Sequence, residues 1–138
     1  MKAQPQELRI GNYLLDDEDD TLVVVSKIET PEYTDWNSGD EFNIVALKYG
    51  TKEHYLEGDF RKILLTEEWL LKLGFVWSIQ HQAFYLKGFD YVLDVCKEYC
   101  RVIKHRRTGE VLINVQYVHQ LQNLFFILTN QELTFKLD

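Results

Sequence analysis

The stretch over residues 117–137 constrains the fold most, because it predicts a helix, its end and a following strand in one passage. Asn130 should end the helix, since asparagine tolerates the left-handed conformation of a helix C-cap. Residues 132–137 then alternate polar and apolar side chains, which predicts a half-buried closing strand. The residues expected on the buried face of the helix recur at spacings of three and four: Val118, Leu121, Leu124, Phe125 and Leu128.

The length of 138 residues suits one domain with one core. Only two prolines, Pro5 and Pro31, interrupt the chain, and nothing in its composition indicates a linker. No apolar run approaches the roughly 20 residues of a membrane span, and residues 1–5 lack the apolar segment of a signal peptide. We therefore expect a single cytoplasmic domain over 1–138, with a β portion over 1–64 and a second portion over 65–138.

The first half of the chain predicts short antiparallel strands. Residues 7–15 and 21–28 are rich in β-branched side chains and are joined by the acidic run 16–20, as in a hairpin with a charged tip. Residues 42–49 predict a third strand, and 54–56 a short fourth. Strands this short should curl into a strongly twisted, barrel-like sheet.

The second half predicts a short helix from an N-cap at Thr66 to a C-terminal Gly74, with Trp69 and Leu73 buried. Two strands should follow, over 75–80 and 83–89. Residues 90–115 fit helical spacing as well, but we interpret them as strands because a turn at 106–109 separates 100–105 from 110–115. The predicted class is α+β: an N-terminal antiparallel barrel-like sheet, a short helix, a β-meander, and a C-terminal helix with its closing strand.

The net charge of −7 is unevenly distributed. Residues 1–69 contain 16 acidic and 7 basic side chains, a net of −9, whereas residues 70–138 contain 6 acidic and 8 basic, a net of +2. General nucleic-acid binding is disfavoured, because phosphate repels a surface of this net sign.

Three sequence blocks carry a resemblance to known proteins: LRIGNY at 8–13, LTEEWLLKLGF at 65–75 and YVHQLQNLFF at 117–126. In this order they resemble a set of small uncharacterised proteins of phages and integrated elements of Bacteroides-type bacteria, over most of the chain. The resemblance implies a phage or mobile-element origin. It implies no activity, because the set offers no catalytic or binding residues to carry over.

Enzymatic motifs are missing from the sequence. It contains no GxSxG elbow, no glycine-rich phosphate loop and no HExxH, and the acidic run lacks the glycine and distant glutamate of an EF-hand. Cys96 and Cys100 are interpreted as reduced core thiols, and His119 as part of a helical face rather than a catalytic group. The four histidines have no metal-binding spacing, so neither a metal nor a cofactor is predicted.

The remaining candidates are binding residues. Acidic side chains can steer a basic partner, exposed aromatics anchor interfaces, and basic turns hold phosphate or carboxylate, although a solvated turn and a self-packed loop explain the same residues. The candidates are Asp16, Asp17, Asp19, Asp20, Tyr33, Trp36, Lys104, Arg106 and Arg107.

We expect a non-enzymatic binding protein whose favoured partner is a host defence protein, such as a CRISPR nuclease, which it would inhibit. One alternative is a binder of a small nucleotide immune signal, with an aromatic ring stacked on the base and the basic turn on phosphate. The other is a structural or regulatory accessory protein. No membrane partner is expected.

Overall fold

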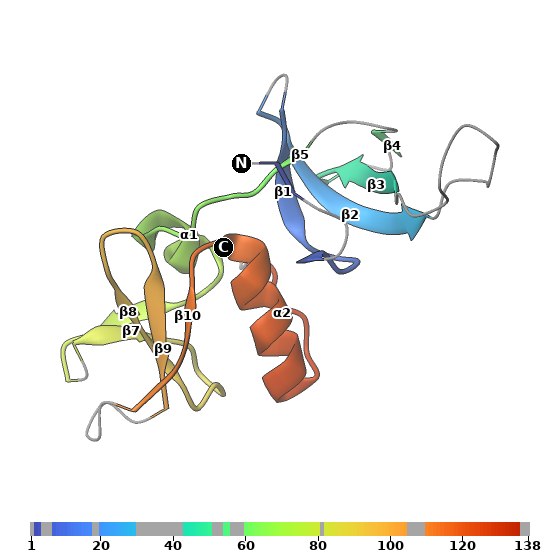
Figure 1. Cartoon of the computed structure of the whole chain (residues 1–138). Coiled ribbons are helices and arrows are strands. Elements are labelled where there is room, and N and C mark those ends of the chain that lie inside the picture. Colours follow the sequence, from blue (N-terminus) through green and yellow to red (C-terminus); the bar gives the residue numbers. More distant parts are fainter. Residues whose placement is uncertain are drawn as a thin grey trace. The chain divides into compact units, whose positions relative to one another are not determined.

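The computed structural model shows a mixed α+β protein, mostly antiparallel strands, with a C-terminal helix (Figure 1). The chain divides into two compact units, unit 1 over residues 1–63 and unit 2 over residues 64–138, one residue before the predicted division into two portions. Each unit contains one open antiparallel sheet among its described residues, rather than a closed barrel. The described residues are 2–3, 7–17, 20–29, 43–50, 54–55, 60–80, 82–104 and 110–135.

Unit 1 is built on a sheet in the strand order β4-β3-β2-β1-β5. β2, β3 and the short β4 lie where the sequence predicts strands. β5 pairs antiparallel with β1 and was not predicted, because two residues are too few to show a periodicity. The bounds are β1 (Tyr13–Asp16), β2 (Leu22–Glu29), β3 (Asn43–Lys48), β4 (His54–Tyr55) and β5 (Phe60–Arg61).

The predicted first strand begins at Tyr13 rather than at residue 7. A turn precedes it, in which Asn12 Oδ1 accepts a hydrogen bond from the Arg9 N–H at 2.6 Å and the Asn12 N–H donates to the Arg9 carbonyl at 3.1 Å. Gly11 has a φ of 96°, in the region that favours glycine. These local bonds form the turn around the buried Asn12, while the Gly11 N–H still donates to the Val25 carbonyl of β2 at 2.8 Å.

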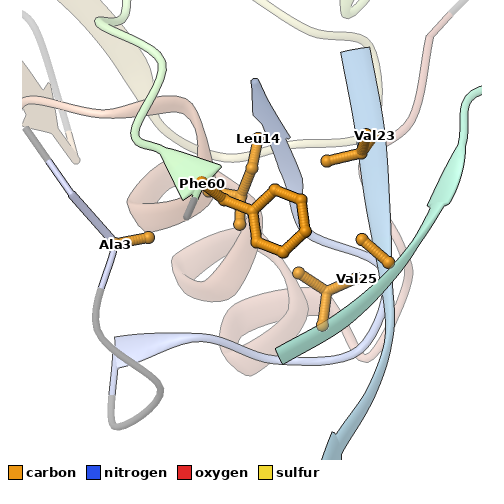
Figure 2. Close-up of a cluster of buried hydrophobic side chains, with 6 residues drawn as sticks. Ala3, Leu14, Val23, Val25 and Phe60 are labelled. Carbon is orange, nitrogen blue, oxygen red and sulfur yellow. The ribbon is translucent and has the colours of Figure 1, made fainter. Parts of the chain in front are cut away.

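The core of unit 1 gathers on one face of its sheet. Val23 and Val25 alternate inward along β2, and Figure 2 shows the Phe60 ring beside Leu14, Val23 and Val25. The Ala3 N–H donates to the Phe60 carbonyl at 2.8 Å, which fixes the N-terminal segment to β5. The buried cluster is Ala3, Leu14, Val23, Val25, Ala46 and Phe60.

Unit 2 contains the predicted meander, in the order β10-β9-β8-β7-β6. Within the ambiguous segment 90–115, the described residues form three strands and no helix, as preferred from the sequence, and the predicted turn at 106–109 lies outside the described residues. Because the order is sequential, β6 and β10 are the two edges of this sheet. The bounds are β6 (Val76–Ser78), β7 (Ala83–Tyr85), β8 (Val92–Val95), β9 (Cys100–Ile103) and β10 (Val111–Val115).

The short helix α1 (Glu67–Lys72) is capped as predicted. Thr66 Oγ1 accepts a hydrogen bond from the Trp69 N–H at 3.3 Å. At the other end, Gly74 has a φ of 95°, and the Phe75 N–H donates to the Leu70 carbonyl at 2.9 Å, as in a Schellman motif. Leu73 is buried, whereas Trp69 is only half-buried and stacks on Phe135 with ring centroids 5.1 Å apart.

Helix α2 (Val118–Thr129) ends at Asn130 as predicted, with Asn130 in the left-handed conformation at a φ of 59°. Val118, Leu121 and Phe125 are buried, and Phe125 lies 5.0 Å from Phe89 between ring centroids. The prediction was wrong for the remaining positions, because Leu124 is half-buried and Leu128 is exposed. The buried face turns toward His119 and Gln122 instead.

The predicted closing strand is absent from the described residues 132–135, and 136–137 lie outside the described residues. Leu133 is fully buried, and its carbonyl accepts a hydrogen bond from Gln122 Nε2 at 3.1 Å. The returning chain is therefore bound to α2 through a side chain and to Trp69 through the Phe135 ring. The alternating pattern reflects one-sided burial without a partner strand.

Candidate functional site

The acidic hairpin tip is partly neutralised inside unit 1. Asp17 Oδ1 lies 3.0 Å from Arg61 Nε, and Asp20 forms a second ion pair with the same guanidinium. Asp16 is almost buried at the end of β1. Asp19 lies outside the described residues. The tip thus presents fewer unpaired carboxylates than its sequence suggests.

Of the other five predicted binding residues, the structure describes one, Lys104. Lys104 is exposed after β9, and its N–H donates to the Glu110 carbonyl at 3.2 Å. Tyr33, Trp36, Arg106 and Arg107 lie outside the described residues. Of the nine predicted residues, the structure therefore places Asp16, Asp17 and Asp20 beside one another and Lys104 in the other unit.

The boundary between the units also separates the charge. Unit 1 contains 14 acidic and 7 basic residues, so it carries the whole net charge of −7. Unit 2 contains 8 of each and is neutral overall. Long-range electrostatic attraction of a basic molecule would therefore originate in unit 1 rather than in unit 2.

The two cysteines differ in burial, and Cys100 is the buried one. Burial raises the pKa of the Cys100 thiol to about 12, and negative charge on Cys96, Asp94 and Glu67 acts in the same direction. Cys100 is therefore protonated at neutral pH. Cys96 is half-exposed, and Arg101 in the neighbouring strand is held by Asp94 at 2.6 Å. The hydrogen bond to Asp94 raises the pKa of Arg101, so the guanidinium stays charged.

The β10 edge of unit 2 exposes apolar side chains on both faces. Val111, Leu112 and Ile113 are 41%, 47% and 47% exposed, and Asn114 is exposed as well. Val111 pairs with Ile103 and Ile113 with Val102, and neighbouring residues of β9 point to opposite faces, so Val111 and Ile113 lie on opposite faces of the sheet and both faces expose an apolar side chain there. Figure 1 shows the start of β10 lying away from α1 and α2.

The β6 edge is apolar too. Val76 is 46% exposed and Trp77 is 52% exposed, with the Trp77 ring 5.3 Å from Phe84 between centroids. Neither edge contains the lysine or proline with which proteins usually block strand addition, although β10 has an irregularity between Val111 and Ile113. Unit 2 therefore presents two uncharged edges with exposed apolar side chains.

An open polar pocket lies at the end of β10. Its volume is about 290 Å³. Gln120 belongs to the first turn of α2, and its Oε1 accepts hydrogen bonds from the N–H groups of Gln116 at 2.7 Å and Tyr117 at 3.0 Å. This capping contact fixes the helix start beside the β8–β9 turn. The lining residues are Glu98, Tyr99, Asn114, Val115, Gln116 and Gln120.

The sequence reasoning missed both the edge and the pocket. An apolar Val-Leu-Ile run at the last strand of a predicted meander was the available signal for the edge. The pocket had no such signal, because its lining comes from a turn, a strand end and a helix start.

No family model matches the chain, and neither a curated protein nor a solved structure matches it. The described part of the chain has no helix long and apolar enough to cross a membrane. Within the same residues, no three His, Cys, Asp or Glu side chains are grouped to hold a metal ion.

Proposed function

We propose that the chain is a non-enzymatic binding protein that acts by occupying a partner protein. The observation that carries this proposal is the uncovered apolar edge of unit 2 at β10, a surface that strand addition or side-chain packing by another protein would cover. The β6 edge, with Trp77, offers the residue type that most often anchors an interface.

The reactive side chains support a non-enzymatic role. Cys100 is buried and its pKa is about 12, so it is a poor nucleophile at neutral pH. His119 is 1% exposed and therefore is not accessible to a substrate in solution. The polar residues that line the pocket at the end of β10 do not include a nucleophile next to a general base.

The resemblance to phage and mobile-element proteins makes the proposal more specific. Such a protein benefits from binding a host defence effector, so inhibition of an effector such as a CRISPR nuclease is the action we propose. This step rests on the three sequence blocks and on the absence of catalytic motifs from the sequence.

Affinity capture from lysate of a bacterial host, quantified by mass spectrometry, tests the proposal. The baits are the wild type, Leu112→Lys on β10, Val76→Lys on β6 and Ile127→Lys on α2. Ile127 is 77% exposed and serves as the matched control, since it receives the same charge away from both edges.

We expect one host protein to be captured by the wild type and by Ile127→Lys, and to be reduced at least about tenfold by an edge variant, the effect of losing roughly 1.4 kcal/mol. Equal capture by all four baits, or enzymatic turnover by the purified chain, would contradict the proposal.

A further inference from the structure

The chain just after β10 already pairs with an antiparallel segment. Leu64 pairs antiparallel with Tyr117, directly after β10, and the Leu65 N–H donates to the Gln116 carbonyl at 2.9 Å. The chain then turns into α1 after Thr66 and leaves the rest of the edge. The free part of the edge is thus continuous with a stretch on which strand pairing is observed.

The backbone groups available on this edge follow from the same hydrogen bond. Because the Gln116 carbonyl points toward Leu65, the alternation of a strand directs the N–H and C=O of Asn114 to the same side, away from β9. An added antiparallel strand would find a donor and an acceptor at Asn114, flanked by the apolar side chains of Leu112 and Ile113.

The pocket determines which side chain would be bound at one end of an added strand. Of its lining residues, Glu98 is the one with a charged side chain, and the others include Tyr99 and three amide residues. Neighbouring strands lie about 4.8 Å apart, so a side chain on an added strand must cross β10 to reach Glu98. Arginine and lysine are long enough and carry the complementary charge.

We propose that β10 and the Glu98 pocket form one binding site for an extended segment of a partner protein that adds antiparallel to β10. β10 runs toward the pocket, so the N-terminal residues of the added segment lie at the pocket. The segment carries an arginine or lysine there and β-branched or other apolar residues in its following positions, over Leu112 and Ile113. This inference rests on the proposed function, since it names the kind of segment that the partner supplies.

A bead library of random hexapeptides, acetylated and amidated so that only side chains carry charge, is the probe. It is screened against the labelled full chain. We expect retained peptides to be enriched in Arg or Lys at the first two positions and in Val, Ile or Thr after them, because these residues suit an added strand.

Two pairs of variants locate the site. Leu112→Lys should abolish retention, whereas Ile127→Lys should not, because only the first places a charge on the edge. Glu98→Gln should remove the preference for a basic residue and leave the apolar preference, whereas Asp90→Asn, which removes an exposed carboxylate of unit 2 outside the pocket, should change neither. Amide shifts at 98–99 and 111–116 in NMR spectra with the best peptide should show the same surface.

The inference is wrong if no peptide is retained, if retained peptides show no basic preference, or if that preference survives Glu98→Gln. A host protein captured through an edge while the peptides show no basic preference would refute this inference alone. Peptide selection as expected, with no host protein captured by any bait, would instead refute the proposed function.

Discussion

At the scale of the residue, burial decides which chemically capable side chains can act. Cys100 and His119 were both placed on the correct kind of element by the sequence, a strand and a helix. Cys100 is buried, as its interpretation as a core thiol predicted, whereas the same interpretation was wrong for the half-exposed Cys96. The burial of His119, which is 1% exposed, depends on what packs against α2 and could not be predicted from local pattern. Asp17 and Asp20 were predicted as part of a free acidic tip, whereas Arg61, from a strand distant in sequence, pairs with both.

The two thiols should react at very different rates. We expect iodoacetamide at pH 8 to alkylate the half-exposed Cys96 and to spare Cys100, whose raised pKa and burial disfavour both the thiolate and access. Trypsin cleaves after Lys97, so peptide mass spectrometry reads the two sites separately. Denatured protein, in which both cysteines should react, is the control. Equal rates in the folded chain would show that Cys100 is accessible.

The same pKa shift predicts a dependence of stability on alkaline pH. Cys100 has an ordinary value of 9.0 when unfolded and about 12 when folded, so the unfolded chain loses this proton first. The contribution of Cys100 to the free energy of unfolding is therefore complete below pH 9 and is lost as the pH rises toward 12. Denaturant titrations between pH 8 and 11 should show a steeper fall for the wild type than for Cys100→Ala. Lysine and tyrosine titrations are common to both proteins, so parallel curves would refute the assignment.

At the scale of the element, periodicity and caps predicted what is encoded locally. The helices begin or end at the predicted residues, Thr66, Gly74 and Asn130, because a cap is a contact within one turn of the helix. β5 and the absence of a strand at 132–135 could not be predicted, since pairing depends on a partner distant in sequence. The meander implied that its first and last strands are edges, but the pocket beside β10 required three segments to meet.

Alanine substitutions of two leucines on α2 should distinguish the buried face seen in the structure from the face that the sequence predicted. Leu121→Ala should lower the free energy of unfolding by about 2–5 kcal/mol, because it empties a fully buried site. Leu128→Ala should cost less than about 1 kcal/mol, because its side chain is exposed in the last turn. Both changes keep the helix propensity similar, so chemical denaturation compares packing directly. Equal losses would place Leu128 in the core, as the spacing alone predicted.

At the scale of the whole molecule, charge and apolar surface are divided between the units. Unit 1 carries the net charge of −7, and unit 2 is neutral and carries the two uncovered apolar edges. The halves of the sequence showed this asymmetry, with −9 and +2, because charge can be counted without a fold. The exposure of β10 could not be predicted from the sequence in the same way, because an identical Val-Leu-Ile run in a central strand would be buried. In the function we propose, steering by unit 1 and docking on unit 2 would therefore be separable contributions to binding.

Whether the molecule has one core or two can be tested with a matched pair of buried phenylalanines. Phe60 lies in the core of unit 1 and Phe75 in that of unit 2, each at most 1% exposed, so either change to alanine should cost about 3–5 kcal/mol. Because each unit is compact by its own contacts, we expect native-state hydrogen exchange to rise most over β1–β3 in Phe60→Ala and most over β7–β9 in Phe75→Ala. Exchange that rises equally over the whole chain in both variants would instead show one cooperative domain, as the length and composition predicted. That outcome would also mean that a partner bound at β10 stabilises the acidic hairpin of unit 1.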